Sequence, residues 1–280
     1  MSKQKEQKPG YGKILDAWIP PKDAGDPIGC VVTSFTFEPE LFEEECLGRF
    51  LQLETNATED GPAYLVEREE KLSQLECAAA LVDQHHARGV RSLRWDLLPA
   101  RLPRGILHAK VSLLLWSRYA RLIVASANLT KGGYRRNHEV FGVLDYFAGS
   151  GVPLGPLAEI TGFLLDAVHY ADPAGRLGSA AIRRWNVFLG RVSRVTRDWG
   201  AAKSPPTIAK PHCFSVVTGP GRPSALDTLR EQWPDNSPPN EAFVVSPFFD
   251  PPEVPNAPAR ELWALLKQRG EATVEFDVTA

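Results

Sequence analysis

Hydrophobic and polar residues alternate in a way that predicts strands and helices in turn from residue 30 onward. Residues 30–37 are rich in β-branched and aromatic side chains, which is typical of a buried strand. The apolar spacing of 39–51, which begins with proline and acidic residues, is typical of a helix. By the same reasoning we predict a strand at 63–67, an amphipathic helix at 71–89 and a strand at 90–95.

Three strand-like runs then follow one another, at 106–116, 121–129 and 139–146. Two amphipathic runs, at roughly 156–171 and 179–198, predict helices. Strands that alternate with helices, followed by several consecutive strands, indicate an α/β fold with a mixed sheet flanked by helices.

The composition changes after residue 198, where proline, glycine and alanine predict a linker. Beyond it, 243–266 repeats the order seen at 31–51: a strand, a serine, an aromatic pair, an acid, a proline and a helix. We therefore predict the start of a second pseudo-repeat. The predicted parts are a head at 1–28, a first half at 29–198, a linker at 199–211 and the incomplete beginning of a second half at 212–280.

Composition excludes several classes of protein. The 280 residues are 43% hydrophobic with a net charge of −2, as in an ordinary globular chain. Four scattered cysteines lack zinc-site spacing and are typical of a reducing compartment. The first ten residues do not have the pattern of a signal peptide, and no apolar run has membrane-spanning length. We expect a cytoplasmic protein that does not act at a membrane.

His108 and Lys110 are two polar residues in an otherwise hydrophobic predicted strand. Side chains alternate along a strand, so both point to one face. Burial of a histidine beside a lysine is costly unless an anion or polar partner compensates. Ser126 and Asn128 share a face where the next predicted strand ends. If the two strands form a hairpin, His108, Lys110 and Asn128 converge.

These three residue types suit the hydrolysis of a phosphodiester. An imidazole can attack phosphorus, while an ammonium and an amide hold the phosphate oxygens as negative charge develops. No acidic cluster suited to Mg²⁺ accompanies them, so we predict chemistry without a metal ion or other cofactor. A His-x-Lys triplet alone is common by chance, and most such matches have no functional meaning.

The stretch 105–141 resembles the phospholipase D superfamily, whose motif is His-x-Lys followed by an asparagine after a small residue. The superfamily's usual aspartate would fall at Leu115 and is absent, and "SANL" replaces Gly-Ser-x-x-Asn. Both departures are closer to the tyrosyl-DNA phosphodiesterase branch and its bacterial relatives. That branch has a polar residue eleven positions after the asparagine, here Glu139, and its second half opens with a strand and a Pro-Gly turn, as at 215–223.

The resemblance implies a phospholipase D-like α/β fold and hydrolysis through a covalent phosphohistidine. His108 would be the nucleophile, Lys110 and Asn128 would hold the phosphate, and Glu139 would support them. A histidine of a second motif would protonate the leaving group and later activate water. That requirement fits the physical chemistry, because one imidazole must be neutral while its partner is protonated at the same pH.

The sequence contains no second His-x-Lys motif, and three explanations remain. The chain is the front part of a longer protein with its second motif in a missing C-terminal part, or it forms a homodimer that joins two copies of His108. In the third, it is a catalytically silent module that binds nucleic acid or phosphate. We interpret His85 and His86 as part of an exposed helix, and His138 as a surface residue.

The loop after Asn128 predicts a nucleic-acid substrate. Lys131, Arg135 and Arg136 are placed to contact backbone phosphates, together with Ser126, and Tyr134 is placed to stack on a base. A solvated basic turn is an equally good interpretation of the same residues. No apolar interfacial stretch favours a phospholipid substrate.

Overall fold

The computed structural model describes residues 13–55, 58–88, 94–171, 179–199, 213–219, 221–232, 239–245, 253–266 and 273–277. The chain divides into two units, Met1–Cys213 and Phe214–Ala280, each of which is considered by itself. Apart from residue 199, the predicted linker lies outside the described residues. The predicted domain boundaries therefore stay a prediction.

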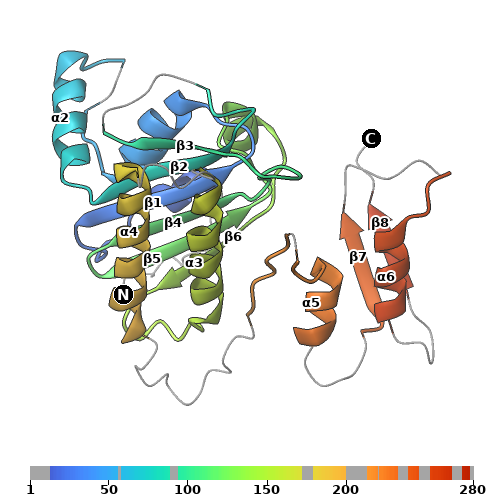
Figure 1. Cartoon of the computed structure of the whole chain (residues 1–280). Coiled ribbons are helices and arrows are strands. Elements are labelled where there is room, and N and C mark those ends of the chain that lie inside the picture. Colours follow the sequence, from blue (N-terminus) through green and yellow to red (C-terminus); the bar gives the residue numbers. More distant parts are fainter. Residues whose placement is uncertain are drawn as a thin grey trace, which may run out of the picture. The chain divides into compact units, whose positions relative to one another are not determined.

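A six-stranded mixed sheet forms the centre of the first unit, in the order β3-β2-β1-β4-β5-β6 (Figure 1). β1, β2 and β3 are parallel, whereas β4, β5 and β6 each run antiparallel to the preceding strand in this order. The strands are β1 (Pro27–Ser34), β2 (Cys77–Asp83), β3 (Asp96–Ala100), β4 (Val111–Trp116), β5 (Tyr119–Ala125) and β6 (Phe141–Tyr146). The predicted α/β class with a mixed sheet flanked by helices is confirmed.

Helices cover both faces of this sheet. On one face lie α3 (Gly155–Ala167), continued by η4 (Val168–Ala171), and α4 (Ala180–Arg197), side by side in Figure 1. On the other face η1 (Ile14–Trp18), η2 (Leu41–Leu47) and α1 (Gly48–Phe50) pack their apolar side chains against alternate residues of the strands. This second layer forms the larger aromatic core.

The region 63–83 differs from the prediction. Residues 63–67, predicted as a strand, lie inside the helix α2 (Pro62–Ser73). Residues 77–83, predicted as the second part of a helix, form β2, which is buried along its whole length. A central parallel strand is covered on both faces, so it is continuously apolar and lacks the alternation that normally distinguishes strand from helix. The alanines of β2 added to the error because alanine favours helices.

The third strand also lies later than predicted. The predicted strand at 90–95 falls mostly outside the described residues, and the observed β3 occupies 96–100 instead. Pro99 sits within β3, which is tolerated because β3 is an edge strand of the sheet.

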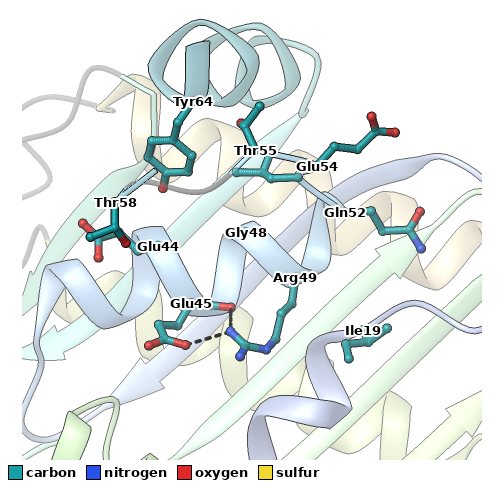
Figure 2. A pocket seen from close by; sticks show the side chains of 11 residues that line it. Ile19, Glu44, Glu45, Gly48, Arg49, Gln52, Glu54, Thr55, Thr58 and Tyr64 are labelled. Atoms are coloured by element: carbon teal, nitrogen blue, oxygen red, sulfur yellow. Dashed lines mark hydrogen bonds and ion pairs between the residues drawn. The ribbon is translucent and has the colours of Figure 1, made fainter. Parts of the chain in front are cut away.

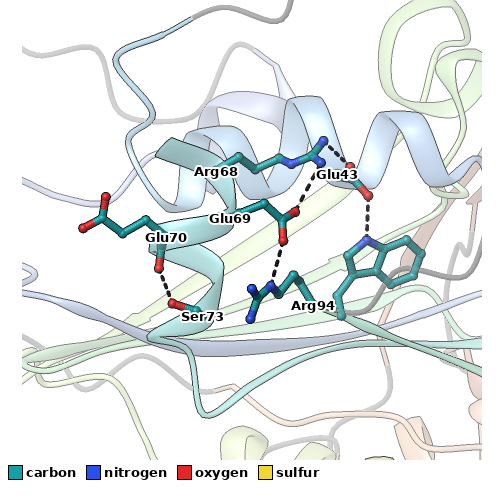
Figure 3. Close-up of polar contacts among 7 residues, drawn as sticks. Glu43, Arg68, Glu69, Glu70, Ser73 and Arg94 are labelled. Carbon is teal, nitrogen blue, oxygen red and sulfur yellow. Dashed lines mark hydrogen bonds and ion pairs between the residues drawn. The ribbon is translucent and has the colours of Figure 1, made fainter. Parts of the chain in front are cut away.

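An ion-pair network attaches α2 to the rest of the first unit (Figure 3). Arg68 of α2 pairs with Glu43 of η2 and, at 3.3 Å, with Glu69. Glu69 accepts a hydrogen bond of 2.7 Å from Arg94, which stands just before β3. Glu43 also accepts from the Trp95 indole at 2.8 Å. The network joins three elements that are far apart in the sequence.

The second unit contains α5 (Ala225–Gln232), β7 (Glu241–Val245), α6 (Ala257–Leu265) and β8 (Thr273–Asp277). β7 and β8 pair in parallel, so β7, α6 and β8 form a βαβ unit like β1, the helices at 41–73 and β2. The strand that was predicted to precede the Pro-Gly turn in 215–223 is not formed, since residues 213–219 are not a strand in the structure. Ser246, the counterpart of Ser34 in the predicted repeat, lies outside the described residues. Among the helices described, none has the length and apolarity to cross a membrane.

Candidate active site

Polar residues gather at one end of the strands, where the parallel strands β1, β2 and β3 end, β4 begins and β5 ends. We call this end the edge of the sheet. The carboxyl ends of parallel strands are the usual place for ligands in open α/β sheets. His108 and Lys110 lie in the segment that leads into β4, not within the strand as predicted. The main-chain N–H of Val111 donates to the hydroxyl of Thr33 in β1 at 3.0 Å, which fixes the segment at this edge.

The side chains of His108 and Lys110 are in direct contact. The Lys110 ammonium lies 3.2 Å from Nε2 and 3.3 Å from Nδ1 of the imidazole, and it donates to the main-chain oxygen of His108 at 3.0 Å. The preceding residue, Leu107, is buried, whereas His108 is exposed. Partial burial and the neighbouring ammonium lower the pKa of His108 below its ordinary value. This favours the neutral imidazole, which is the form that can act as a nucleophile.

After the β4–β5 hairpin, Ser126 lies beside Glu139, whose charge acts on Lys110. The predicted pairing exists: Val111 faces Val124, and the N–H of Ala125 donates to the Lys110 oxygen at 3.0 Å. Ser126 then donates through its hydroxyl to the Glu139 carboxylate and accepts from the N–H of Val140 at 3.0 Å. Burial lowers the pKa of Lys110, while the charge of Glu139 raises it. Glu139 therefore helps to keep the ammonium charged.

Asn128 is held by the main chain that follows β1. Its Oδ1 accepts from the N–H of Phe35 at 3.2 Å and from the N–H of Thr36 at 3.4 Å. Because main-chain N–H groups need an acceptor, these contacts orient the amide and turn its Nδ2 donors away from them. The Phe35 ring lies 5.1 Å from the His108 ring, centre to centre. Phe35 thus contacts Asn128 through its backbone and His108 through its side chain.

The basic loop differs from the prediction at one residue. Tyr134, in η3 (Gly132–Arg136), is only 7% exposed and belongs to the core, with its hydroxyl beside Trp18 and Ser112. Its burial raises the pKa of the phenol. No ring face is left for a base, so the expected stacking by Tyr134 is wrong in this structure.

The cations of the loop remain at the surface. Lys131, Arg135 and Arg136 are exposed, and Arg135 pairs with Glu45. Glu45 also pairs with Arg49 at 2.8 Å (Figure 2). These last two residues line a pocket of about 590 Å³ between the helices at 41–50 and α2. None of the predicted catalytic residues lines that pocket. The candidate site lies elsewhere, at the end of the sheet where β1, β2 and β3 terminate.

Four residues at this edge were not predicted as site residues. The carboxylate of Asp83, at the end of β2, is 3% exposed and accepts from the His85 Nδ1 at 2.8 Å. The other two are His86 and Phe35, whose ring centres lie 4.5 Å apart. The interpretation of 71–89 as a helix placed both histidines elsewhere. The available signal was an apolar run, 77–82, that ends in an aspartate.

The electrostatics of Asp83 follow from these bonds. Burial alone would raise the pKa of its carboxyl group, but hydrogen bonds from His85 and from the N–H of Leu107 lower it. The carboxylate is therefore ionised at neutral pH. Within the described residues, no three histidine, cysteine, aspartate or glutamate side chains are arranged to hold a metal ion.

Comparisons with known proteins find similar solved structures but no similar sequence family. No family model and no curated protein matches the chain. Two crystal structures of mutant yeast tyrosyl-DNA phosphodiesterase match 61% of this chain at 11% and 12% identity, each with a TM-score of 0.37. A further structure of the yeast enzyme gives 11% identity, the same 61% and a TM-score of 0.36. The chain spans 36 to 38% of the length of these proteins. Similarity of this extent does not by itself assign a family.

Proposed function

We propose that the chain carries the nucleophilic half of a phosphodiesterase site, in which His108 attacks phosphorus and forms a covalent phosphohistidine. The observation that carries the proposal is the pairing of His108 with Lys110. An exposed imidazole with a lowered pKa lies 3.2 Å from an ammonium at the end of the sheet where the parallel strands terminate. This arrangement supplies a neutral nucleophile and a cation for the phosphate in one place.

The neighbouring groups support the same chemistry. As the N–P bond forms and the bond from phosphorus to the leaving oxygen breaks, negative charge grows on the non-bridging oxygens. The Lys110 ammonium and the Nδ2 of Asn128 are the donors available to stabilise that charge. The charge of Glu139, which accepts a hydrogen bond from Ser126, favours the charged form of Lys110. None of these steps requires a metal ion.

Nucleic acid is the substrate class that we propose. The exposed Lys131, Arg135 and Arg136 follow Asn128 directly and would meet phosphates that flank the scissile one. Phosphate contacts of this kind make binding depend strongly on salt concentration. The solved structures noted above are of an enzyme named for the tyrosyl-DNA linkage, which is in keeping with this class.

The competing proposal is a catalytically silent module that binds nucleic acid or phosphate through the same cations. The observation that favours it is the lack of a second His-x-Lys motif in the sequence. A homodimer, or a longer protein with a second motif in a missing C-terminal part, would account for the same lack and still give an enzyme. Both of those arrangements retain His108 as the nucleophile.

Hydrolysis of an oligonucleotide with a 3′-aryl phosphate, in the presence of EDTA, tests the proposal. We expect His108→Gln to lower the first-turnover release of the aryl group by at least about a thousand-fold. Lys110→Met should lower it by roughly a hundred-fold or more. His169→Gln, an exposed histidine in η4, is the matched control and should retain full release. Salt-dependent binding of the oligonucleotide with no release by the unchanged chain would favour the silent module.

A further inference from the structure

An aspartate and a histidine that the proposed mechanism does not use form a pair in the loop after β2. Asp83 Oδ1 accepts from the His85 Nδ1 at 2.8 Å and from the His85 main-chain N–H at 3.0 Å. The carboxylate is buried, while the side chain of His85 is 65% exposed. One end of the imidazole is thus anchored inside the protein and the other end faces solvent.

Such a pair has a definite chemical consequence. A carboxylate that accepts from Nδ1 fixes the proton on that nitrogen and leaves Nε2 to exchange its proton with a substrate. The hydrogen bonds that lower the pKa of Asp83 keep this carboxylate charged at neutral pH.

The pair is linked to the proposed nucleophile through the backbone of the residue that precedes it. The second oxygen of Asp83, Oδ2, accepts from the main-chain N–H of Leu107 at 2.9 Å. One carboxylate therefore holds both His85 and the residue that precedes His108. The loop makes a second contact on the same side, because the His86 ring and the His108 ring both pack on Phe35.

From this geometry we propose that His85 is the proton-transfer residue of the site, with Asp83 as its positioning residue. The inference rests on the proposed function and extends it. The proposed reaction needs a group that protonates the leaving oxygen and then activates water, and His85 would supply it from within this chain without a second His-x-Lys motif. The same loop would then provide the acid and the base of the reaction.

The steps balance as follows. His108 attacks phosphorus, the N–P bond forms, and the leaving oxygen departs with the proton of the His85 Nε2. In the second step the neutral His85 takes a proton from water as the water oxygen attacks phosphorus and the N–P bond breaks. His85 ends protonated, His108 ends free, and one water molecule has been consumed.

Hydrolysis of the covalent intermediate, here called release of the adduct, tests the inference separately from formation of the adduct. The full chain is mixed with the 3′-aryl phosphate oligonucleotide, and the adduct is followed by intact mass over time. An aryl leaving group needs little protonation, so His85→Gln should form the adduct as the unchanged chain does. Its release should be slower by about a hundred-fold to ten-thousand-fold. In His85→Ala, added imidazole should accelerate release, which a purely structural role would not produce.

The outcomes separate the two levels of the proposal. An adduct whose release is unaffected by His85→Gln overturns the assignment of His85 and leaves the nucleophile in place. Slow release in His86→Gln instead of His85→Gln transfers the role to the neighbouring imidazole and also overturns the assignment. Stable adduct in the unchanged chain shows that the second imidazole comes from elsewhere. No adduct at all in the unchanged chain overturns the proposed function, and this inference with it.

Discussion

At the scale of single residues, the contact between His108 and Lys110 determines the chemistry available at the site. Burial, and then the ammonium beside it, lower the pKa of His108 and favour the neutral imidazole. The lysine in turn depends on Glu139, whose charge offsets the effect of burial. The protonation of His108 thus depends in part on Lys110, and that of Lys110 in part on Glu139.

The pKa of His108 is directly measurable. We expect an NMR titration to give a value below the ordinary 6.5, and Lys110→Met to move it upward because the repelling charge is removed. The folded chain binds this proton less tightly than the unfolded chain, so protonation of His108 reduces stability as the pH falls below 6.5. A pKa that stays constant or falls in Lys110→Met would contradict this.

Asn128 has two roles that substitutions can separate. Asn128→Ala removes the acceptor for the N–H groups of Phe35 and Thr36 and should lower the free energy of unfolding by about 1–3 kcal/mol. Asn128→Asp keeps an acceptor in that place but loses the Nδ2 donors. It should retain most of the stability in urea unfolding while release of the aryl group is lost. Equal stability of both variants would argue against the observed orientation of the amide.

At the scale of elements, the segment after β5 is fastened to the segment after β1. Leu129 donates through its N–H to Ser34 at 2.9 Å, and Glu38 donates through its N–H to the Leu129 oxygen at 2.8 Å. Asn128 therefore stands in a fixed place although it lies outside any strand. The loop must also pass closely over Asn128, which requires a glycine at 133.

Gly133→Ala tests this close passage. A Cβ at this position would stand 2.4 Å from the main-chain oxygen of Asn128, so the backbone has to move. We expect a loss of about 1–3 kcal/mol in the free energy of unfolding, together with weaker catalysis. Gly132→Ala is the matched control, because its Cβ would meet Thr130 only at 3.5 Å. If the two variants behave alike, the packing of this loop is not as described.

The elements also show where reasoning from sequence succeeds. The helices α3 and α4 could be predicted from their amphipathic spacing, and the strands β1, β4, β5 and β6 from short runs rich in β-branched, leucine and aromatic residues. β2 could not, because it is buried along its whole length without alternation and is rich in alanine, which favours helices, and the Asp83–His85 pair was missed with it. Tyr134 looked like a surface residue in a polar loop. Only its tertiary contacts with Trp18 and Ser112 explain its burial.

At the scale of the whole molecule, every candidate residue comes from the first unit. That unit contains the complete six-stranded sheet and both helical layers. Its first described helix, η1, is tied to the sheet by Arg121 of β5, which is 2% exposed. Arg121 pairs with Asp145 of β6 at 2.6 Å and donates to the main-chain oxygens of Ala17 and Ile19 at 2.8 and 2.9 Å.

Loss of this cation should therefore destabilise the entire unit. Arg121→Met removes the cation that pairs with the Asp145 carboxylate and that donates to two main-chain oxygens, and we expect a loss of about 3–5 kcal/mol. Urea unfolding should show a lower midpoint with an unchanged slope. Arg118→Met, an exposed arginine in the turn of the β4–β5 hairpin, should change stability by less than about 0.5 kcal/mol. Similar losses in both variants would contradict the role of Arg121.

The most direct test of the central claim is to locate the covalent bond. The chain is incubated with the 3′-aryl phosphate oligonucleotide in EDTA, digested under alkaline conditions, and the phosphorylated peptide is mapped by mass spectrometry. We expect an acid-labile phosphoryl linkage on His108 that disappears in His108→Gln and remains in His169→Gln. An adduct on any other residue, or binding of the oligonucleotide without an adduct, would contradict the proposal that His108 is the nucleophile of a phosphodiesterase.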